Sequence, residues 1–151
     1  MKISRFSIVV ASLAILFGAL VAFGQIGSTV SSPNIKYYVS AASSGAAQAN
    51  NCVLNATGGL TTYISDVRIT GDGATTGSVI AITLTGTAST NTPTFYLTVP
   101  TGATTAITAL DIHLTTPIAA SGPNQAITVN VPSFGTGNLS AAVVASGYQT
   151  Q

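Results

Sequence analysis

The sequence predicts an all-β protein: a single antiparallel β-sandwich of about seven or eight strands, with jelly-roll or immunoglobulin-like connections. Short runs of residues alternate between apolar and polar, which is the pattern of a strand with one buried face and one exposed face. Turn-forming residues (Gly, Pro, Asn and Asp) separate these runs. After Gln25, no stretch has apolar residues at the spacing of an amphipathic helix.

The first 24 residues differ from the rest and are typical of a secretory signal. Lys2 and Arg5 precede an uncharged, largely apolar run, Phe6–Phe23, and small residues stand at Ala22 and Gly24. The alternative is an uncleaved membrane anchor, because about 18 apolar residues reach the lower limit for spanning a bilayer. We expect an N-terminal apolar helix, cleavage after Gly24, and an exported protein in the extracellular space or on a virion surface.

Residues 25–36 are expected to form an extended arm, because they are polar, irregular and interrupted by Pro33. The sandwich domain then covers residues 37–151, a length that can bury one adequate core. In chain order, the expected strands are Tyr37–Ala41, Ala47–Leu54, Thr61–Thr70, Ile80–Leu84, Phe95–Val99, Leu110–Leu114, Ile127–Val131 and Leu139–Ser146.

Four of these segments alternate most regularly, and their apolar members define the expected core. These members are Ile80, Ile82, Leu84, Phe95, Leu97, Val99, Ile112, Leu114, Ile127, Val129 and Val131. The segments between the strands contain clear turn signals. These signals are Gly71–Gly77, Asn91–Pro93, Pro100–Gly102, Ser121–Asn124 and Pro132–Asn138.

The low charge excludes several classes of function. Only four Lys/Arg and three Asp occur in 151 residues, or 5%, where an ordinary soluble domain has about 25%. The chain has too few cations to bind nucleic acid, and its single cysteine, Cys52, excludes an internal disulfide and a cysteine-ligated zinc or iron–sulfur site. The apolar neighbours of Cys52 favour a buried thiol over one that pairs between chains. We expect no cofactor and no enzymatic activity.

The few titratable residues offer little catalytic chemistry. Asp111 and His113 stand two apart on one strand, but no Gly-x-Ser-x-Gly motif accompanies them, so they are interpreted as a solvent-facing surface. Asp66 and Arg68 have the same spacing and are expected to form an exposed ion pair. Asp72, between two glycines, is interpreted as a tight turn instead of a calcium loop.

A few residues are candidates for contacts with partners. Arg68 and the tyrosines Tyr37, Tyr38 and Tyr148 could contact a partner surface, and the tyrosines could alternatively line a carbohydrate platform or lie partly buried. Two short sequons make Asn55 and Asn138 candidate glycosylation sites.

The composition of the mature chain favours a structural role. From Gln25 on, 49 of 127 residues are Thr, Ser, Asn or Gln, and the net charge is −1. A neutral, hydroxyl-rich surface does not repel its own copies, and charged side chains are depleted at the centres of interfaces. We therefore expect a subunit that contacts copies of itself or other structural subunits of a particle. No nucleic acid is expected as a partner, and a membrane only through residues 6–23 if they stay uncleaved.

Three segments carry a resemblance to a known group of proteins. The segments are Tyr37–Ser43 at the start of the sandwich, Ser65–Gly71 within it, and Ala145–Gln149 at its end. The layout resembles small phage- and prophage-encoded virion-associated β-sandwich proteins with a signal-like N-terminus. The resemblance implies a capsid, decoration or spike role and no catalytic residues. A subunit of an extracellular filament, with the arm adding a strand to the next copy, and a secreted carbohydrate-binding module are the alternatives.

Overall fold

The computed structural model of the protein describes residues 36–151, which form eight β-strands. The predicted N-terminal helix and the arm up to residue 35 lie outside the described residues. Within residues 36–151 no helix is long and apolar enough to cross a membrane. The strands are β1 (Tyr37–Ser44), β2 (Asn50–Leu54), β3 (Thr61–Gly71), β4 (Ser78–Thr85), β5 (Thr94–Val99), β6 (Leu110–Ala119), β7 (Ile127–Val131) and β8 (Ala141–Thr150).

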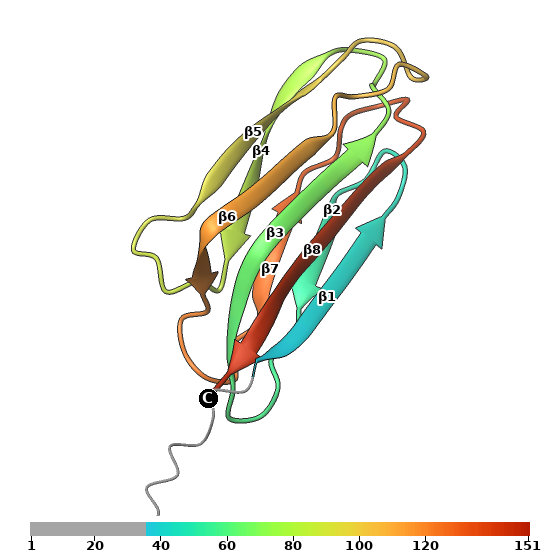
Figure 1. Cartoon of the computed structure of the whole chain (residues 1–151). Coiled ribbons are helices and arrows are strands. Elements are labelled where there is room, and N and C mark those ends of the chain that lie inside the picture. Colours follow the sequence, from blue (N-terminus) through green and yellow to red (C-terminus); the bar gives the residue numbers. More distant parts are fainter. Residues whose placement is uncertain (1–35) are drawn as a thin grey trace, which may run out of the picture. The chain divides into compact units, whose positions relative to one another are not determined.

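The strands form two four-stranded sheets in which every paired neighbour is antiparallel (Figure 1). Sheet A has the order β1-β8-β3-β6, and sheet B has the order β2-β7-β4-β5. Strand β1 pairs with β8, β2 with β7, β3 with β6 and β4 with β5, so the chain folds as four nested pairs. This arrangement confirms the predicted all-β class with two antiparallel sheets.

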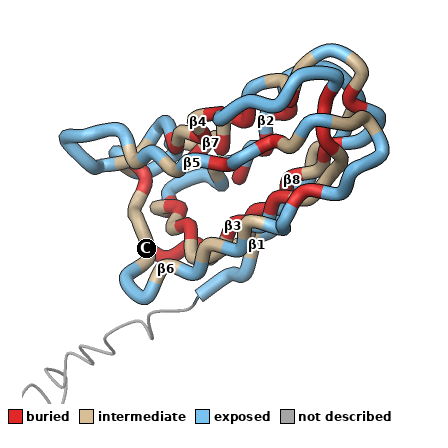
Figure 2. Tube along the Cα trace, turned by 90° about the horizontal axis from the view of Figure 1, so that it is seen from above, coloured by how far each residue is buried: buried red, intermediate tan, exposed pale blue. Residues whose placement is uncertain are grey.

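The core lies between the two sheets, where buried residues line the facing surfaces (Figure 2). Strand β7 alternates strictly between buried and less buried positions, and β8 does so as far as Gln149, as the period of two predicts. Eight of the eleven expected core residues are buried. They are Ile80, Ile82, Leu84, Leu97, Val99, Ile127, Val129 and Val131.

The other three expected core residues, Phe95, Ile112 and Leu114, are only partly buried and pack against the core from its margin. The reason is their position: β5 and β6 are the last strands of sheets B and A, so each has a neighbour on one side only. At the opposite margin, the consecutive strands β1 and β2 pack against each other and close the sandwich.

Several strand boundaries differ from the sequence prediction: β1 and β6 continue to Ser44 and Ala119, and the bounds of β2 and β8 also change. Strand β2 begins at Asn50 instead of Ala47, because Ala47 has a φ of 48°, a left-handed conformation that interrupts an extended strand. Strand β8 begins at Ala141 and continues to Thr150, because it pairs with both β1 and β3 along its length. The C-terminal strand is therefore central in sheet A.

A β-bulge in β3 changes which side chains face the core. Against β8 the pairing passes from Ile64–Gly147 to Asp66–Ser146, so Ser65 is an additional residue of β3. Against β6 the register shifts at the same point, where Ser65 stands across from the unpaired residues 114–117. Before the bulge the even-numbered Ile64 is buried, and after it the odd-numbered Val67 is buried. Without the bulge, Asp66 and Arg68 would point into the core. The bulge thus places both charges on the outer face of sheet A.

Gly147 of β8 lies directly opposite the bulge. A Cβ atom at this position would lie 1.8 Å from the carbonyl oxygen of Tyr63, a distance that no side chain tolerates without backbone movement. The absence of a side chain on Gly147 therefore allows β8 to approach β3 closely where β3 is distorted.

We expect Gly147→Ala to lower the free energy of unfolding by about 1–3 kcal/mol, because the added methyl group must displace the β3 backbone. Urea unfolding of the chain from Gln25 on measures the effect. Gly58→Ala is the matched control, because a Cβ there meets nothing within 4 Å. Equal stability of the two variants would contradict this account of the bulge.

Candidate interaction surfaces

Four ionisable residues meet on the outer face of sheet A. The pairing of β3 with β6 sets Asp66 opposite His113 and Arg68 opposite Asp111. Arg68 Nε lies 3.3 Å from Asp111 Oδ1, and His113 Nδ1 bonds to Asp66 Oδ1. The predicted Asp66–Arg68 pair is therefore wrong. Residues two apart on a strand lie about 6.7 Å apart, whereas directly opposed residues on neighbouring strands lie about 5 Å apart.

Asp66 is the centre of a small hydrogen-bond network. Its Oδ2 accepts hydrogen bonds from Ser65 Oγ at 2.5 Å and from Ser146 Oγ at 3.4 Å. The Ser65 hydroxyl, followed by the bond to His113 and its charge, holds the pKa of the Asp66 carboxyl below its ordinary value. Both serines bond to the carboxylate, whereas a nucleophilic triad places the histidine between the serine and the acid. The network therefore holds the Asp66 carboxylate in place and does not have the order of a nucleophilic triad.

Three tyrosines form a row across β1, β8 and β3 on the same outer face. Tyr148 stands opposite Tyr38 on one side and Tyr63 on the other. The rings of Tyr63 and Tyr148 stack with centroids 4.9 Å apart and planes 11° apart, and Lys36 Nζ lies 4.5 Å from the Tyr148 centroid. Tyr63 reaches this ring from β3, and Lys36, which directly precedes β1, places its ammonium group near the same ring. Sequence reasoning missed the stacking because it depends on the register.

The residues that were expected to contact a partner do not form one cluster. Tyr38 is largely exposed at the end of this row, whereas Tyr37 lies at the end of the sandwich beside a hollow that Leu60 and Gln149 also line. Arg68 is exposed and held by Asp111. Of the four candidates, the structure therefore brings Tyr38 and Tyr148 together on the outer face of sheet A, with Arg68 on the same face beyond Asp66.

The two sequon asparagines have opposite environments. Asn55 is exposed, whereas Asn138 is buried. Asn138 Nδ2 donates to the backbone carbonyls of Asp72, Gly73 and Ser140 at 2.7, 3.3 and 2.8 Å, and its Oδ1 accepts from Ala47 N–H. In the folded domain this nitrogen joins three loops and is not accessible for glycosylation.

Two other sequence expectations concerned metals and thiols. Asp72 lies in an isolated antiparallel β-bridge with Ala106 instead of the predicted tight turn, and its Oδ2 accepts a hydrogen bond from Ser140 Oγ at 2.7 Å. In the part of the chain that the structure describes, no three His, Cys, Asp or Glu side chains gather as metal ligands would. Cys52 is buried in the core, as its apolar neighbours predicted, and burial raises the pKa of its thiol.

The outer face of sheet B differs from that of sheet A in having no charged residue. Its strands present threonine, asparagine, valine, alanine and one tyrosine to the exterior. The outward-facing residues are Asn51, Val53, Val79, Ala81, Thr83, Thr85, Thr94, Tyr96, Thr98, Thr128 and Asn130. The charges of residues 36–151 are thus segregated from this sheet.

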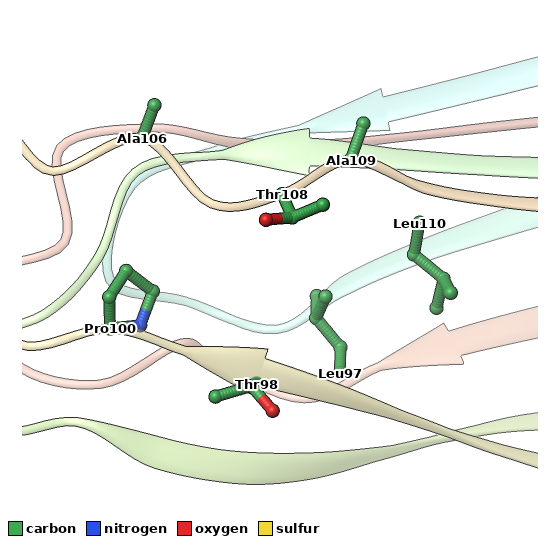
Figure 3. A pocket seen from close by; sticks show the side chains of 7 residues that line it. All are labelled: Leu97, Thr98, Pro100, Ala106, Thr108, Ala109 and Leu110. Atoms are coloured by element: carbon green, nitrogen blue, oxygen red, sulfur yellow. The ribbon is translucent and has the colours of Figure 1, made fainter.

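A shallow, mostly apolar hollow of about 420 Å³ lies at the margin between β5 and β6 (Figure 3). The hollow is lined by Leu97 and Thr98 of β5, by Leu110 of β6, and by Pro100, Ala106, Thr108 and Ala109 of the segment that connects the two strands. The hollow exists because the two marginal strands do not close over each other as β1 and β2 do.

Comparison of the chain with known protein families, with curated proteins and with solved structures finds no match to any of them.

We expect Ser65→Ala to raise the pKa of Asp66 toward the ordinary value of about 3.9. Because the native pKa is depressed, Asp66 stabilises the fold above its unfolded pKa, and this contribution is lost as the pH falls through the native pKa. NMR titration of the side-chain carboxyl measures the shift. Ser146→Ala, which removes a longer hydrogen bond, should have a smaller effect. An unchanged pKa in Ser65→Ala would refute the assigned cause.

We expect Asn138→Ala to cost about 1–3 kcal/mol of stability, because it leaves loop carbonyls without their donor. Asn55→Ala, at the exposed sequon, should change stability by less than about 0.5 kcal/mol. Chemical unfolding of both variants gives the comparison, and indistinguishable costs would show that Asn138 does not join the loops energetically.

Proposed function

We propose that this protein is a non-enzymatic structural subunit that self-associates or coats a larger particle, most favourably a virion as a capsid, decoration or spike protein. The nested strand pairing carries this proposal, because it supports a jelly roll over an immunoglobulin-like sandwich. In the latter the first two strands share a sheet, whereas here β1 and β2 lie in different sheets. Jelly rolls recur in viral capsid domains as well as in lectins and cupins.

The low charge of the surface supports a subunit that can pack against copies of itself. Residues 36–151 carry two cations against three Asp, and four of the ionisable side chains pair with one another on sheet A. Long-range repulsion between copies is correspondingly weak. The threonine-rich exterior suits strands that are exposed before assembly, because threonine favours extended backbone without adding charge.

The site geometry supports the absence of catalysis. Asp66 occupies the middle of the Ser–Asp–His network and Asp111 is paired with Arg68, so neither acid orients His113 toward a serine. The proposed role therefore depends on surfaces.

Two other functions use the same chain differently. In an extracellular filament, residues 25–36 would add a strand to the next subunit. The marginal strands offer limited room for this, since Pro117 lies within β6 and Pro93 and Pro100 flank β5. In a carbohydrate-binding module, open tyrosine faces would stack on sugars, but Tyr63 already stacks on the ring of Tyr148 and the Lys36 ammonium group lies near the same ring.

Light scattering coupled to size exclusion separates these functions for the chain from Gln25 on and for a version that begins at Asn34. A capsid or coat role predicts that both assemble, and strand exchange predicts that only the longer chain assembles. If both stay monomeric and do not bind the native particle from which the protein derives, the structural proposal is wrong.

A further inference from the structure

We propose that the outer face of sheet B is the surface through which the subunit associates, and that its partner is the same face of a second copy of this chain. The inference rests on the proposed function and adds to it the location and symmetry of the contact. The observation behind it is the segregation of charge between the two sheets.

The charges of residues 36–151 avoid sheet B. Arg68 pairs with Asp111 and Asp66 pairs with His113 on sheet A, while Lys36 covers Tyr148 of the same sheet. Asp72 bonds to Ser140 in the loops at one end. A protein with so few charges could spread them over both faces to maintain solubility, so their confinement leaves one whole face that requires no desolvation of ions.

The uncharged face also exposes apolar side chains among its polar residues. Val79 is 64% exposed and Tyr96 is 71% exposed on the neighbouring strands β4 and β5, and Val53 is exposed on β2. Aromatic and aliphatic side chains of this kind are typical of contact surfaces.

The polar groups on this face are partly satisfied before any partner arrives. Asn130 Nδ2 donates to Thr83 O at 3.3 Å and to Thr85 Oγ1 at 3.0 Å. Covering Asn130 therefore breaks fewer bonds to water than covering a free amide would.

The same face of another copy fits better than sheet A does. Packing sheet B against sheet A would cover Asp66, Arg68, Asp111 and His113 with threonine and valine, and those ions would lose water without gaining partners. Packing sheet B against sheet B buries no charge on either side. A two-fold arrangement provides this, because the same uncharged patch then lies on both sides of the contact.

The size of the face predicts a weak contact. Strands about 4.8 Å apart and five to eight residues long cover roughly 400 Å² in projection, below the 800 Å² per partner that stable complexes bury. The contact should therefore be seen at high concentration or in an assembly that repeats it.

Sedimentation velocity of the chain from Gln25 on, from about 10 µM to about 1 mM, covers the range of weak association. We expect Val79→Lys to raise the dissociation constant at least tenfold, because two ammonium groups would be brought into one uncharged contact. Val144→Lys is the matched control, because Val144 is 45% exposed on the outer face of sheet A. An equimolar mixture of Val79→Lys and Val79→Glu should associate more strongly than either variant alone, since one contact then holds a positive and a negative charge.

Each outcome decides a different point. If Val79→Lys and Val144→Lys weaken association equally, or neither does, the proposed face is wrong although self-association stands. If the mixture associates no more strongly than either variant alone while Val79→Lys is weakened, sheet B binds some other surface and the two-fold contact is wrong. A wild-type chain that stays monomeric throughout overturns this contact, and failure to bind the native particle as well overturns the structural role. Tyr96→Lys repeats the test should Val79→Lys not fold, with folding checked by circular dichroism.

Discussion

One additional residue in β3 determines how charge is distributed over this protein. The bulge at Ser65 reverses the alternation of the strand, so that Val67 and Ile69 enter the core while Asp66 and Arg68 face outward. An isolated charge in that core would cost several kcal/mol, so the bulge is required for a strand of this sequence to pair on both sides. Gly147 makes the distortion possible by leaving room for the β3 backbone.

The ionic face of the domain follows from this placement. Once Asp66 and Arg68 point outward from β3, their partners on β6 complete an ionic cluster on sheet A. Sheet B is neutral because its own strands contain no charged residue. Exposed ion pairs contribute little to stability, about 0–1 kcal/mol each, so the cluster is better understood as a property of the surface. The domain therefore has one ionic face and one neutral face, and the proposed structural role would use the neutral face for packing and the ionic face toward solvent.

The sequence allowed the strands and most of the core to be predicted because both depend on local alternation. Residues such as Ile82 and Val129 can be assigned to the buried face from the alternation of the five residues around them. The ion pairs were mispredicted because the partners of Asp66 and Arg68 lie over 40 positions away, and register is a non-local property. A signal of the bulge was present: the buried residues of β3 change from even to odd numbers after Ile64. The role of Asn138 depends on three loops meeting and has no local signature.

Electron cryomicroscopy of the native assembly that contains this protein tests the central claim most directly. A structural subunit should appear as repeated copies of the two-sheet domain, with the outer face of sheet B buried between copies and Asp66 and His113 facing solvent. Isolated copies with sheet B open to solvent, or contacts made through sheet A, would contradict the account.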